Sequence, residues 1–371
     1  MKILMVNNDK GWGGGQEYLK ALAGQLSKSG CDIYFVCRPG SPSEKNFKTE
    51  GYQVYPIPRN LCGMPKSLVL TASLFRRERF DIVMVTREHD LACTALAWKL
   101  AFPVGRRGKL VACFHTATVR KQPLFSVFDA TVCVSTYVRD KLVRGNSRVR
   151  MPVSVISNGI SMHNEVPEEK FTNDRQRRYF RETGFPLIGM VGAFFKNQCE
   201  LIEIIPALKQ QFPDVTVALV GDDSDFGLSG PVRALAQRMG VDENVIFTGK
   251  VPHDRMADIF YDLDLSVSTF RNEGFGLVHL ESLAAGTPVV CYNEGGQVDI
   301  FASNEIGVLV DGGPGDFVTA VQQLLKDDEH RFAMGRRGVE LVREKFSLEA
   351  MGQNYMDFFA RLRNSNYIQI V

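Results

Sequence analysis

Short apolar segments alternate with segments of helical periodicity along almost the whole chain, and this alternation constrains the fold more than any other feature. Residues 3–6 and 33–37 are apolar runs of strand length, whereas residues 16–28 place their apolar side chains on one helical stripe. Strands that alternate with helices form βαβ units, in which the strands run parallel and the crossovers are right-handed. The sequence therefore predicts an α/β fold with parallel sheets covered by helices.

The alternation occurs twice, and a polar, charged stretch at residues 165–181 follows its first half. A chain of 371 residues also exceeds the usual length of one domain. We predict an N-terminal domain of residues 1–158, joined by a C-terminal helix within residues 347–371, and a C-terminal domain of residues 159–346. Further strands are expected at 54–57, 82–86, 110–113, 131–134, 153–156, 188–191, 216–220, 245–247, 264–269, 289–291 and 308–310.

Composition excludes several classes of protein. Hydrophobic residues make up 44% and charged residues 23%, as in ordinary globular proteins. A net charge of +2 gives no general attraction to nucleic acid, so no nucleic-acid partner is expected. The 8 cysteines show neither C-x-x-C pairs nor zinc spacing, which favours buried thiols in a reducing compartment and no metal. Without a signal peptide or a spanning segment, we expect a cytoplasmic protein that either is free or lies on the membrane surface.

One stretch carries most of the functional signal. Residues 270–290 read F-R-N-E-G-F-G-L-V-H-L-E-S-L-A-A-G-T-P-V-V and run from the end of one predicted strand to the next. Glycines at Gly274 and Gly276 let the backbone approach a ligand, and the helix that follows offers unsatisfied amides to an anion. Glu273 and Glu281 lie about two helical turns apart among apolar residues, where unpaired acids are costly to bury. This pattern favours a ligand with both hydroxyls and phosphates, such as a sugar nucleotide.

Three other predicted strands end in candidate ligand-binding residues. Gly13, Gly14 and Gly15 follow the first strand and suit either a phosphate cradle or a tight turn, and we leave both interpretations open. His115 follows the strand at 110–113, where ligands bind in open parallel sheets. Lys196 lies before a helix start, a position that a bound anion would make favourable. If the two domains face each other, the ligand is expected in the cleft between them.

Basic clusters recur in the first half of the chain, with apolar residues such as Leu74-Phe75 and Pro123-Leu124-Phe125 between them. A solvated surface explains such clusters by default. Their restriction to one predicted domain also favours contact with an anionic membrane or an acidic acceptor. The clusters are Arg76-Arg77 with Arg79, Arg106-Arg107 with Lys109, Arg120-Lys121, and Arg139 with Lys141 and Arg144.

These motifs together resemble the retaining glycosyltransferases of glycosyltransferase family 4, which have the GT-B fold of two facing Rossmann-like domains. The most specific element is E-G-F-G-L-V-H-L-E followed by A-A-G-T-P-V-V, which is similar to the family's E-x7-E motif and its continuation. The resemblance covers nearly the whole chain. Supporting matches are Gly14-Gly15-Gln16-Glu17, Asn158-Gly159, Lys196-Asn197-Gln198 and Gly295-Gly296.

The resemblance implies a role for each matching residue. Glu273 would lie by the hydroxyls of the donor sugar, Glu281 would bind the ribose, and His115 would lie beside the transferred sugar. The diphosphate would be held by Lys196 and by the amides of the glycine-punctuated turn, without a metal or cofactor. Further donor contacts are expected from Gly14, Gly15, Lys250, Val251, Gly274, Phe275, Gly276, Leu277 and Val278. The donor would be a UDP-, GDP- or ADP-linked sugar.

Two residues depart from the family pattern. Ala193 stands where the family commonly has an arginine that holds the diphosphate, and Asp299 stands where glutamate is frequent. The resemblance implies transfer to a glycan or lipid-linked acceptor, in the synthesis of lipopolysaccharide or another envelope glycan. Two alternatives stay open, namely a sugar-nucleotide epimerase of the same fold and a non-catalytic subunit that binds a nucleotide sugar. A nicotinamide dehydrogenase is disfavoured because the first glycine turn lacks G-x-G-x-x-G spacing.

Overall fold

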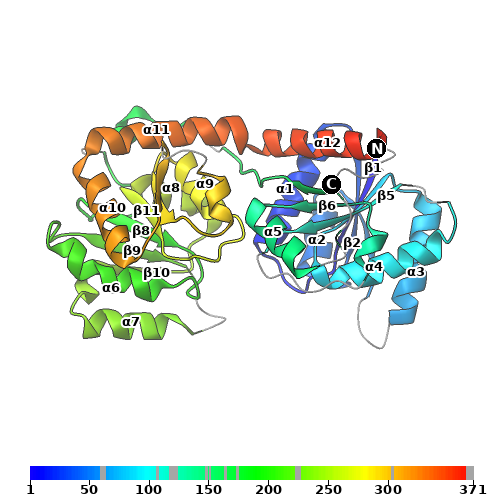
Figure 1. Cartoon of the computed structure of the whole chain (residues 1–371), viewed down its shortest axis with the longest axis horizontal. Helices are drawn as coiled ribbons and strands as arrows, with labels where there is room; N and C mark the ends of the chain where they lie inside the picture. Colours follow the sequence, from blue (N-terminus) through cyan, green and yellow to red (C-terminus); the bar gives the residue numbers. More distant parts are fainter. Residues whose placement is uncertain are drawn as a thin grey trace. The chain divides into compact units, whose positions relative to one another are not determined.

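The computed structural model describes residues 1–58, 64–105, 108–116, 124–146, 149, 152–162, 165–172, 175–221, 227–301 and 305–364. The chain divides into two compact units, shown in Figure 1: Met1–Gly159 with Leu348–Val371, and Ile160–Ser347. The predicted basic residues Arg106, Arg107, Arg120 and Lys121 lie outside the described residues, as does Pro123.

The first unit is built on a parallel sheet of seven strands in the order β3-β2-β1-β4-β5-β6-β7. Its helices include α1, whose buried stripe of Leu19, Leu22, Ala23 and Leu26 is the predicted one. The strands are β1 (Lys2–Asn7), β2 (Asp32–Cys37), β3 (Gln53–Pro56), β4 (Ile82–Val85), β5 (Lys109–Phe114), β6 (Ala130–Cys133) and β7 (Val153–Val155). The helices are α1 (Gly14–Lys28), α2 (Pro42–Thr49), α3 (Met64–Glu78), α4 (Glu88–Ala101), α5 (Thr136–Gly145) and α12 (Leu348–Asn364).

Helix α12, from the end of the chain, completes the core of the first unit. Its buried side chains join those of α1 and of one face of the sheet in a single cluster, and the Tyr18 and Tyr355 hydroxyls hydrogen-bond at 2.6 Å. Gly352 allows this close packing, because a Cβ there would lie 2.7 Å from the Gln25 side chain. Residues of the other sheet face, such as Leu4 and Val83, are also fully buried. Both faces of the sheet are therefore covered, as parallel sheets require.

The second unit repeats the architecture with a parallel sheet in the order β10-β9-β8-β11-β12-β13. Its strands are β8 (Leu187–Val191), β9 (Thr216–Val220), β10 (Val245–Gly249), β11 (Leu265–Ser268), β12 (Val289–Tyr292) and β13 (Gly307–Val310). Its helices are α6 (Gln198–Lys209), α7 (Ser229–Arg238), α8 (Met256–Asp262), α9 (Leu277–Ala284), α10 (Pro314–Lys326) and α11 (Asp328–Lys345). Two parallel sheets with helices confirm the predicted α/β fold class.

The strands of the second unit divide their side chains between two clusters. Ile188 and Met190 pack with α6 and α10 on one face, whereas Leu187 packs with α8 on the other. This alternation follows from the twofold periodicity of a strand. Each strand is therefore fixed from both sides, and the loops at the strand ends start from rigid positions.

Three details differ from the sequence analysis. Helix α2 begins at Pro42, although the sequence Pro39-Gly40-Ser41-Pro42 favours a break in the chain, because Ser41 accepts a hydrogen bond from the Glu44 amide as an N-cap. Helix α5 was not predicted. The apolar residues Leu74, Phe75 and Phe125, taken as interleaved with basic clusters, are instead core residues with at most 4% of their surface exposed.

Two findings bear on the cellular setting. Within the described ranges, none of the helices has the length and apolar character needed to cross a lipid bilayer. The cysteines at the described positions are free thiols, and Cys37, Cys113, Cys133 and Cys291 are buried in the strands. These thiols behave as small core residues.

In both sheets the strand order reverses at one place, between β1 and β4 in the first unit and between β8 and β11 in the second. In open parallel sheets, ligands bind at the carboxyl ends of the strands at such a reversal. The loops after β8 and β11 therefore define a candidate site in the second unit, and the loops after β1 and β4 define one in the first.

Candidate functional site

The loop after β8 positions Lys196 at the strand-order reversal. Gly192 follows the strand with φ +149°, and a Cβ at this residue would lie 2.9 Å from the Lys196 side chain. The absence of a side chain at Gly192 therefore lets Lys196 fold back over the end of the strand. Asn197, with φ +66°, then precedes α6, and its side-chain amide lies 2.7 Å from Glu200.

The loop after β11 brings Glu273 to the same place. The Lys196 Nζ donates to Glu273 Oε2 at 2.7 Å, and the two side chains are only 18% and 17% exposed. Burial raises the pKa of Glu273, but the charge and hydrogen bond of Lys196 outweigh that effect, so its pKa lies below the usual value. The sequence analysis paired the Lys196 charge with a bound anion, whereas in this structure its partner is a carboxylate of the chain.

Gly295 and Gly296, which follow β12, pack against the backbone of Glu273. The Gly296 amide donates to the Glu273 carbonyl at 2.7 Å. Gly295 has φ +78°, and a Cβ there would lie 2.9 Å from the Glu273 carbonyl oxygen and 3.0 Å from that of Arg271. Both the positive φ and the lack of space for a Cβ require glycine at residue 295. A larger residue there would displace the loop that carries Glu273.

Gly295→Ala is expected to destabilise the protein by about 2 kcal/mol or more and to lower kcat/KM as Glu273 is displaced. Gly30→Ala is the matched control, because Gly30 has φ +79° but no atom within 4 Å of the position of a Cβ. The control is expected to lose only about 1 kcal/mol, from backbone strain, with unchanged kinetics. Chemical denaturation and donor kinetics of both variants check this, and equal losses in the two would contradict the supporting role of Gly295.

Helix α9 begins beside the Lys196–Glu273 pair, and a buried histidine shapes its first turn. Gly276 precedes the helix with φ +103°, and a Cβ at this residue would lie 2.5 Å from the His279 ring. The His279 Nε2 lies 3.1 Å from Gln297 Oε1, and burial lowers the pKa of His279 to about 4, so the ring is neutral at neutral pH. The amides of Leu277 and Val278 lie in the first turn, where no intrahelical acceptor is available.

The sequence analysis gave no role to His279 or Gln297, although both lie within quoted motifs or beside them. His279 falls inside G-L-V-H-L-E, and Gln297 directly follows Gly295-Gly296. Both are buried, with exposures of 1% and 0%. Polar side chains in an otherwise apolar helix start were the available signal that the turn is held by hydrogen bonds.

Glu281 lies on α9 and is partly buried, and its side chain makes no hydrogen bond or ion pair with the part of the chain that the structure describes. Burial raises its pKa, and the charges of His253 and Lys196 oppose this only in part. A carboxylate left without a partner in a desolvated position is destabilising unless a ligand binds it. Its environment is thus the opposite of that of Glu273.

The remaining predicted donor contacts of the second unit lie near this helix start. Val251, after β10, packs against the same apolar cluster as Val278 of α9, which places the loop of Lys250 and Val251 beside the helix. Lys250 is exposed. The Phe275 side chain is 3% exposed and contacts the Phe346 ring at 6.2 Å between centroids, so only its backbone faces the turn.

In the first unit, the loop after β1 forms a polar network with the end of β4. Helix α1 begins at Gly14, and a Cβ at Gly15 would lie 3.8 Å from an Arg87 guanidinium nitrogen. Arg87 pairs with Asp9 at 2.6 Å, and Gln16 donates to Asp9 at 2.8 Å. Arg87 thus presents a cation beside the glycine turn, a role that the sequence analysis did not assign, although the residue directly follows a predicted strand.

His115 lies at the carboxyl end of β5 in the first unit. Its ring packs on Tyr18 with centroids 4.6 Å apart, and its Nε2 is buried without a hydrogen-bond partner among the described residues. Burial, assisted by the Arg87 charge, lowers the pKa of His115 to about 4. The imidazole is therefore neutral at neutral pH and has one nitrogen available to a ligand. By contrast, His89 is exposed, and its Nε2 lies 3.7 Å from Asp90 Oδ2.

The site of the second unit combines a lysine, a helix start and two acids of opposite electrostatic character. Such a group can hold a diphosphate by the lysine and the amides, and hydroxyls by the carboxylates. Residues 172–340 match the family described as "Glycosyl transferases group 1", and residues 12–163 match "Glycosyltransferase Family 4". The chain belongs to glycosyltransferase family 4. The resemblance found in the sequence is thereby confirmed.

Relatives within family 4 match this chain over different lengths. The D-inositol 3-phosphate glycosyltransferase of Corynebacterium kroppenstedtii is 28% identical over 75% of this chain and 62% of its own length. The GDP-mannose-dependent alpha-(1-6)-phosphatidylinositol monomannoside mannosyltransferase of Mycolicibacterium smegmatis is 27% identical over 98% and 99%. In four other Corynebacterium relatives named D-inositol 3-phosphate glycosyltransferase, the match spans about half of their length.

The solved structure of Anabaena HepE in complex with UDP has the same fold, with a TM-score of 0.80, 19% identity and coverage of 97% of this chain and 100% of that one. In the present chain, the two acids of the E-x7-E motif are Glu273 and Glu281. Glu273 lies on the loop before α9 and Glu281 lies on α9 itself, and their pKa values are shifted in opposite directions.

Proposed function

We propose that this family 4 protein is a retaining glycosyltransferase that moves a sugar from a nucleotide-sugar donor to an acceptor hydroxyl. The observation that carries the proposal is the Lys196–Glu273 pair, 2.7 Å apart at the strand-order reversal and beside the first turn of α9. In this proposal Lys196 and the amides of the first turn of α9 meet the leaving diphosphate, and Glu273 meets the sugar.

In this mechanism, negative charge develops on the departing diphosphate. Lys196 and the amides of Leu277 and Val278 are fixed donors that stabilise this charge more in the transition state than in the ground state. Glu273 orients the donor sugar and stabilises positive charge near it, rather than forming a covalent bond. Glu281 binds the ribose hydroxyls. Because protein groups supply the positive charge, we propose that no metal or cofactor takes part.

We further propose that the acceptor is a glycan or a lipid-linked molecule used in the synthesis of lipopolysaccharide or another envelope glycan. The mannosyltransferase relative is named for a phosphatidylinositol mannoside acceptor, and the Corynebacterium relatives for D-inositol 3-phosphate. These names support an acceptor that carries a phosphate or a lipid. The donor is UDP-, GDP- or ADP-linked, since HepE was solved with UDP and the mannosyltransferase depends on GDP-mannose.

The proposal is tested by incubating the full chain with UDP-, GDP- and ADP-linked sugars in the presence of EDTA. Each incubation is run with and without acceptors from a lipid extract. We expect acceptor-dependent transfer that EDTA does not lower, and NMR of the product should show the donor's anomeric configuration. Conversion of the donor sugar without acceptor would indicate the epimerase, and donor binding without turnover would indicate the binding subunit. An inverted product or full inhibition by EDTA would contradict the mechanism.

We also propose that α3 and α4 of the first unit contact an anionic membrane on its cytoplasmic side. These helices pack together (Figure 1), and Arg76 donates to the Ala101 carbonyl at 3.0 Å. Apolar side chains are exposed on both helices and on the loop that follows α4: Val69 64%, Leu70 41%, Leu96 39%, Leu100 51% and Val104 91%. Exposed cations accompany them, namely Lys66, Arg76, Arg77 and Lys99. Apolar side chains beside cations suit a charged lipid surface.

Val69→Ser with Leu100→Ser is expected to lower partitioning onto vesicles containing anionic lipid by roughly tenfold or more, because two aliphatic side chains no longer insert. Co-sedimentation with vesicles measures this. Val143→Ser is the control, since Val143 is 47% exposed on α5. Partitioning that falls equally in the control, or does not fall in the double variant, would contradict the contact.

A further inference from the structure

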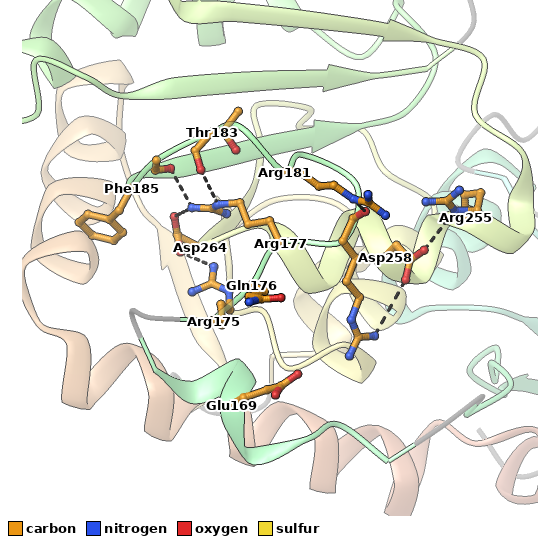
Figure 2. Close-up of a pocket in the computed structure, with 12 residues that line it drawn as sticks. Glu169, Arg175, Gln176, Arg177, Arg181, Thr183, Phe185, Arg255, Asp258 and Asp264 are labelled. Carbon is orange, nitrogen blue, oxygen red and sulfur yellow. Dashed lines mark hydrogen bonds and ion pairs between the residues drawn. The ribbon is translucent and has the colours of Figure 1, made fainter.

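A polar cavity lies in the second unit, near the amino-terminal ends of its strands. This cavity, here named the arginine pocket, has a volume of about 850 Å³ and is shown in Figure 2. Asp264 lines it and directly precedes β11, whereas Lys196 and Glu273 lie beyond the other ends of the strands. Because β8 has 5 residues, the two places are roughly 16 Å apart at about 3.3 Å per residue. The cationic residues that line the pocket are Arg175, Arg177, Arg178, Arg181 and Arg255.

The inner part of the pocket is a buried cluster of cations and acids. Arg175 and Arg177 both pair with the single carboxylate of Asp264, and all three side chains are at most 8% exposed (Figure 2). Lys170 is buried next to them and donates to the backbone carbonyls of Tyr261 and Leu263 at 2.7 and 2.8 Å. Burial, with the charges of Arg175 and Arg177, holds the pKa of Lys170 well below its usual range. Asp262 is also buried there and accepts hydrogen bonds from the backbone amides of residues 178–180, so Asp264 and Asp262 together offset the charges of Arg175 and Arg177.

The buried guanidinium of Arg175 also has an unused donor. Arg175 is 9% exposed as a whole residue, and its Nε has no hydrogen-bond partner among the described residues. Two buried arginines on one aspartate are explained by a structural role, because they tie residues 175–177 to the start of β11. That role uses neither the Arg175 Nε nor the other three arginines of the pocket.

The outer part of the pocket is held open by stacking and by one shared acid. Arg178 stacks on the Tyr261 ring at 3.6 Å from its centroid and lies 3.9 Å from Asp258, which Arg255 also contacts at 3.1 Å. Arg181 is exposed, and its Nε donates to the Arg178 carbonyl at 3.3 Å. Arg181 has no carboxylate partner among the described residues, so most of its donors are available.

We propose that the arginine pocket binds a phosphate-bearing ligand, separately from the donor site. Guanidinium groups offer parallel N–H donors that match the oxygens of a phosphate, and a stacked arginine is already oriented to bind one. The cavity has room for a phosphate ester of metabolite size. The phosphate belongs either to a soluble ester or to a lipid headgroup, and the two sources are separable by experiment.

The test uses pyrophosphate as the probe and isothermal titration of the full chain. Arg178→Gln with Arg181→Gln removes two partly exposed arginines without touching the buried cluster. Arg238→Gln with Arg343→Gln removes the same charge from exposed positions on α7 and α11 and serves as the control. Lys196→Met weakens the donor site independently. Tm values confirm that each variant is folded.

We expect a pyrophosphate site that persists in Lys196→Met and in the control, and whose affinity falls at least tenfold in the Arg178/Arg181 variant. Phosphatidylcholine vesicles with and without phosphatidate form the second arm. Phosphatidate-dependent binding that is lost with the same two arginines assigns the site to a lipid phosphate, and pyrophosphate binding alone assigns it to a soluble ester. If the affinity for neither probe depends on Arg178 and Arg181, the proposal is wrong, and the function proposed for the donor site is unaffected.

Discussion

Lys196→Ala is expected to lower kcat by about two to three orders of magnitude, with a much smaller change in KM for the donor. Lys196 is the cation that meets the charge of the leaving diphosphate, so its contribution is larger in the transition state than in the ground state. Steady-state kinetics over a range of donor concentrations measures both constants. Lys196→Arg should retain part of the rate, because it keeps the charge. Lys326→Ala, at an exposed lysine on α10, should change neither constant.

The same substitution tests the ion pair itself. Because Lys196 holds the pKa of Glu273 below its usual value, the pair's stabilisation is present above the unfolded-state pKa and is lost as the pH falls through the lowered folded-state pKa. Removing Lys196 leaves a buried carboxylate without its partner, and its pKa should then rise. The variant is therefore expected to lose less stability on acidification than the parent protein. A pure KM effect in the kinetics would mean instead that Lys196 only binds the donor.

Glu281→Ala is expected to lose about 1.5–3 kcal/mol of charged hydrogen bonding to the donor, which is roughly a ten- to hundredfold lower kcat/KM. The physical reason is that the Glu281 carboxylate is desolvated on α9 and has no hydrogen-bond or ion-pair partner in the described part of the chain. Unchanged donor kinetics in this variant would remove Glu281 from the ribose-binding role.

The raised pKa of Glu281 predicts a pH dependence of stability opposite in sign to that of Glu273. Its folded-state pKa is raised by burial, so its contribution to stability is fully present below the unfolded-state pKa and is lost as the pH rises through the raised value. Glu281→Gln removes this penalty and is expected to raise the Tm at pH 7 while lowering activity. The gain in Tm should shrink as the pH falls below the raised pKa. A residue retained at the expense of stability is typical of a functional site.

Much of the fold was predictable because the sequence patterns are local. The strands at 216–220 and 265–268 were predicted within a residue or two, since an apolar run between polar turns is enough to identify a buried strand. Helix α2 was missed because its apolar content is low and one proline near its start was interpreted only as a break, although Pro at the first helical position favours a helix. The buried state of Leu74 and Phe75 depends on the contacts that α3 makes, which no single segment encodes.

The residues of the candidate site could be predicted from the sequence, but the hydrogen bonds and ion pairs between them could not. Glu273, Glu281 and Lys196 were all identified from their places near strand ends and in the E-x7-E motif. Their connections, by contrast, join segments that are distant in sequence: Lys196 to Glu273, Gly296 to the Glu273 carbonyl, and His279 to Gln297. Such pairings follow from sheet order, which fixes which loops meet. The arginine pocket was missed for the same reason, because Asp264 is remote in sequence from the arginines that it pairs with.

The claim that a diphosphate is held at the carboxyl ends of β8 and β11 is tested most directly by thermal shift with UDP, GDP and ADP. A ligand at a concentration of about 100 times its Kd stabilises the folded state by about 2.7 kcal/mol, which is a shift of several degrees in Tm. The account predicts that at least one of the three nucleotides produces this shift in the parent protein and a much smaller one in Lys196→Ala. No shift with any of the three, or an equal shift in Lys196→Ala, would contradict it.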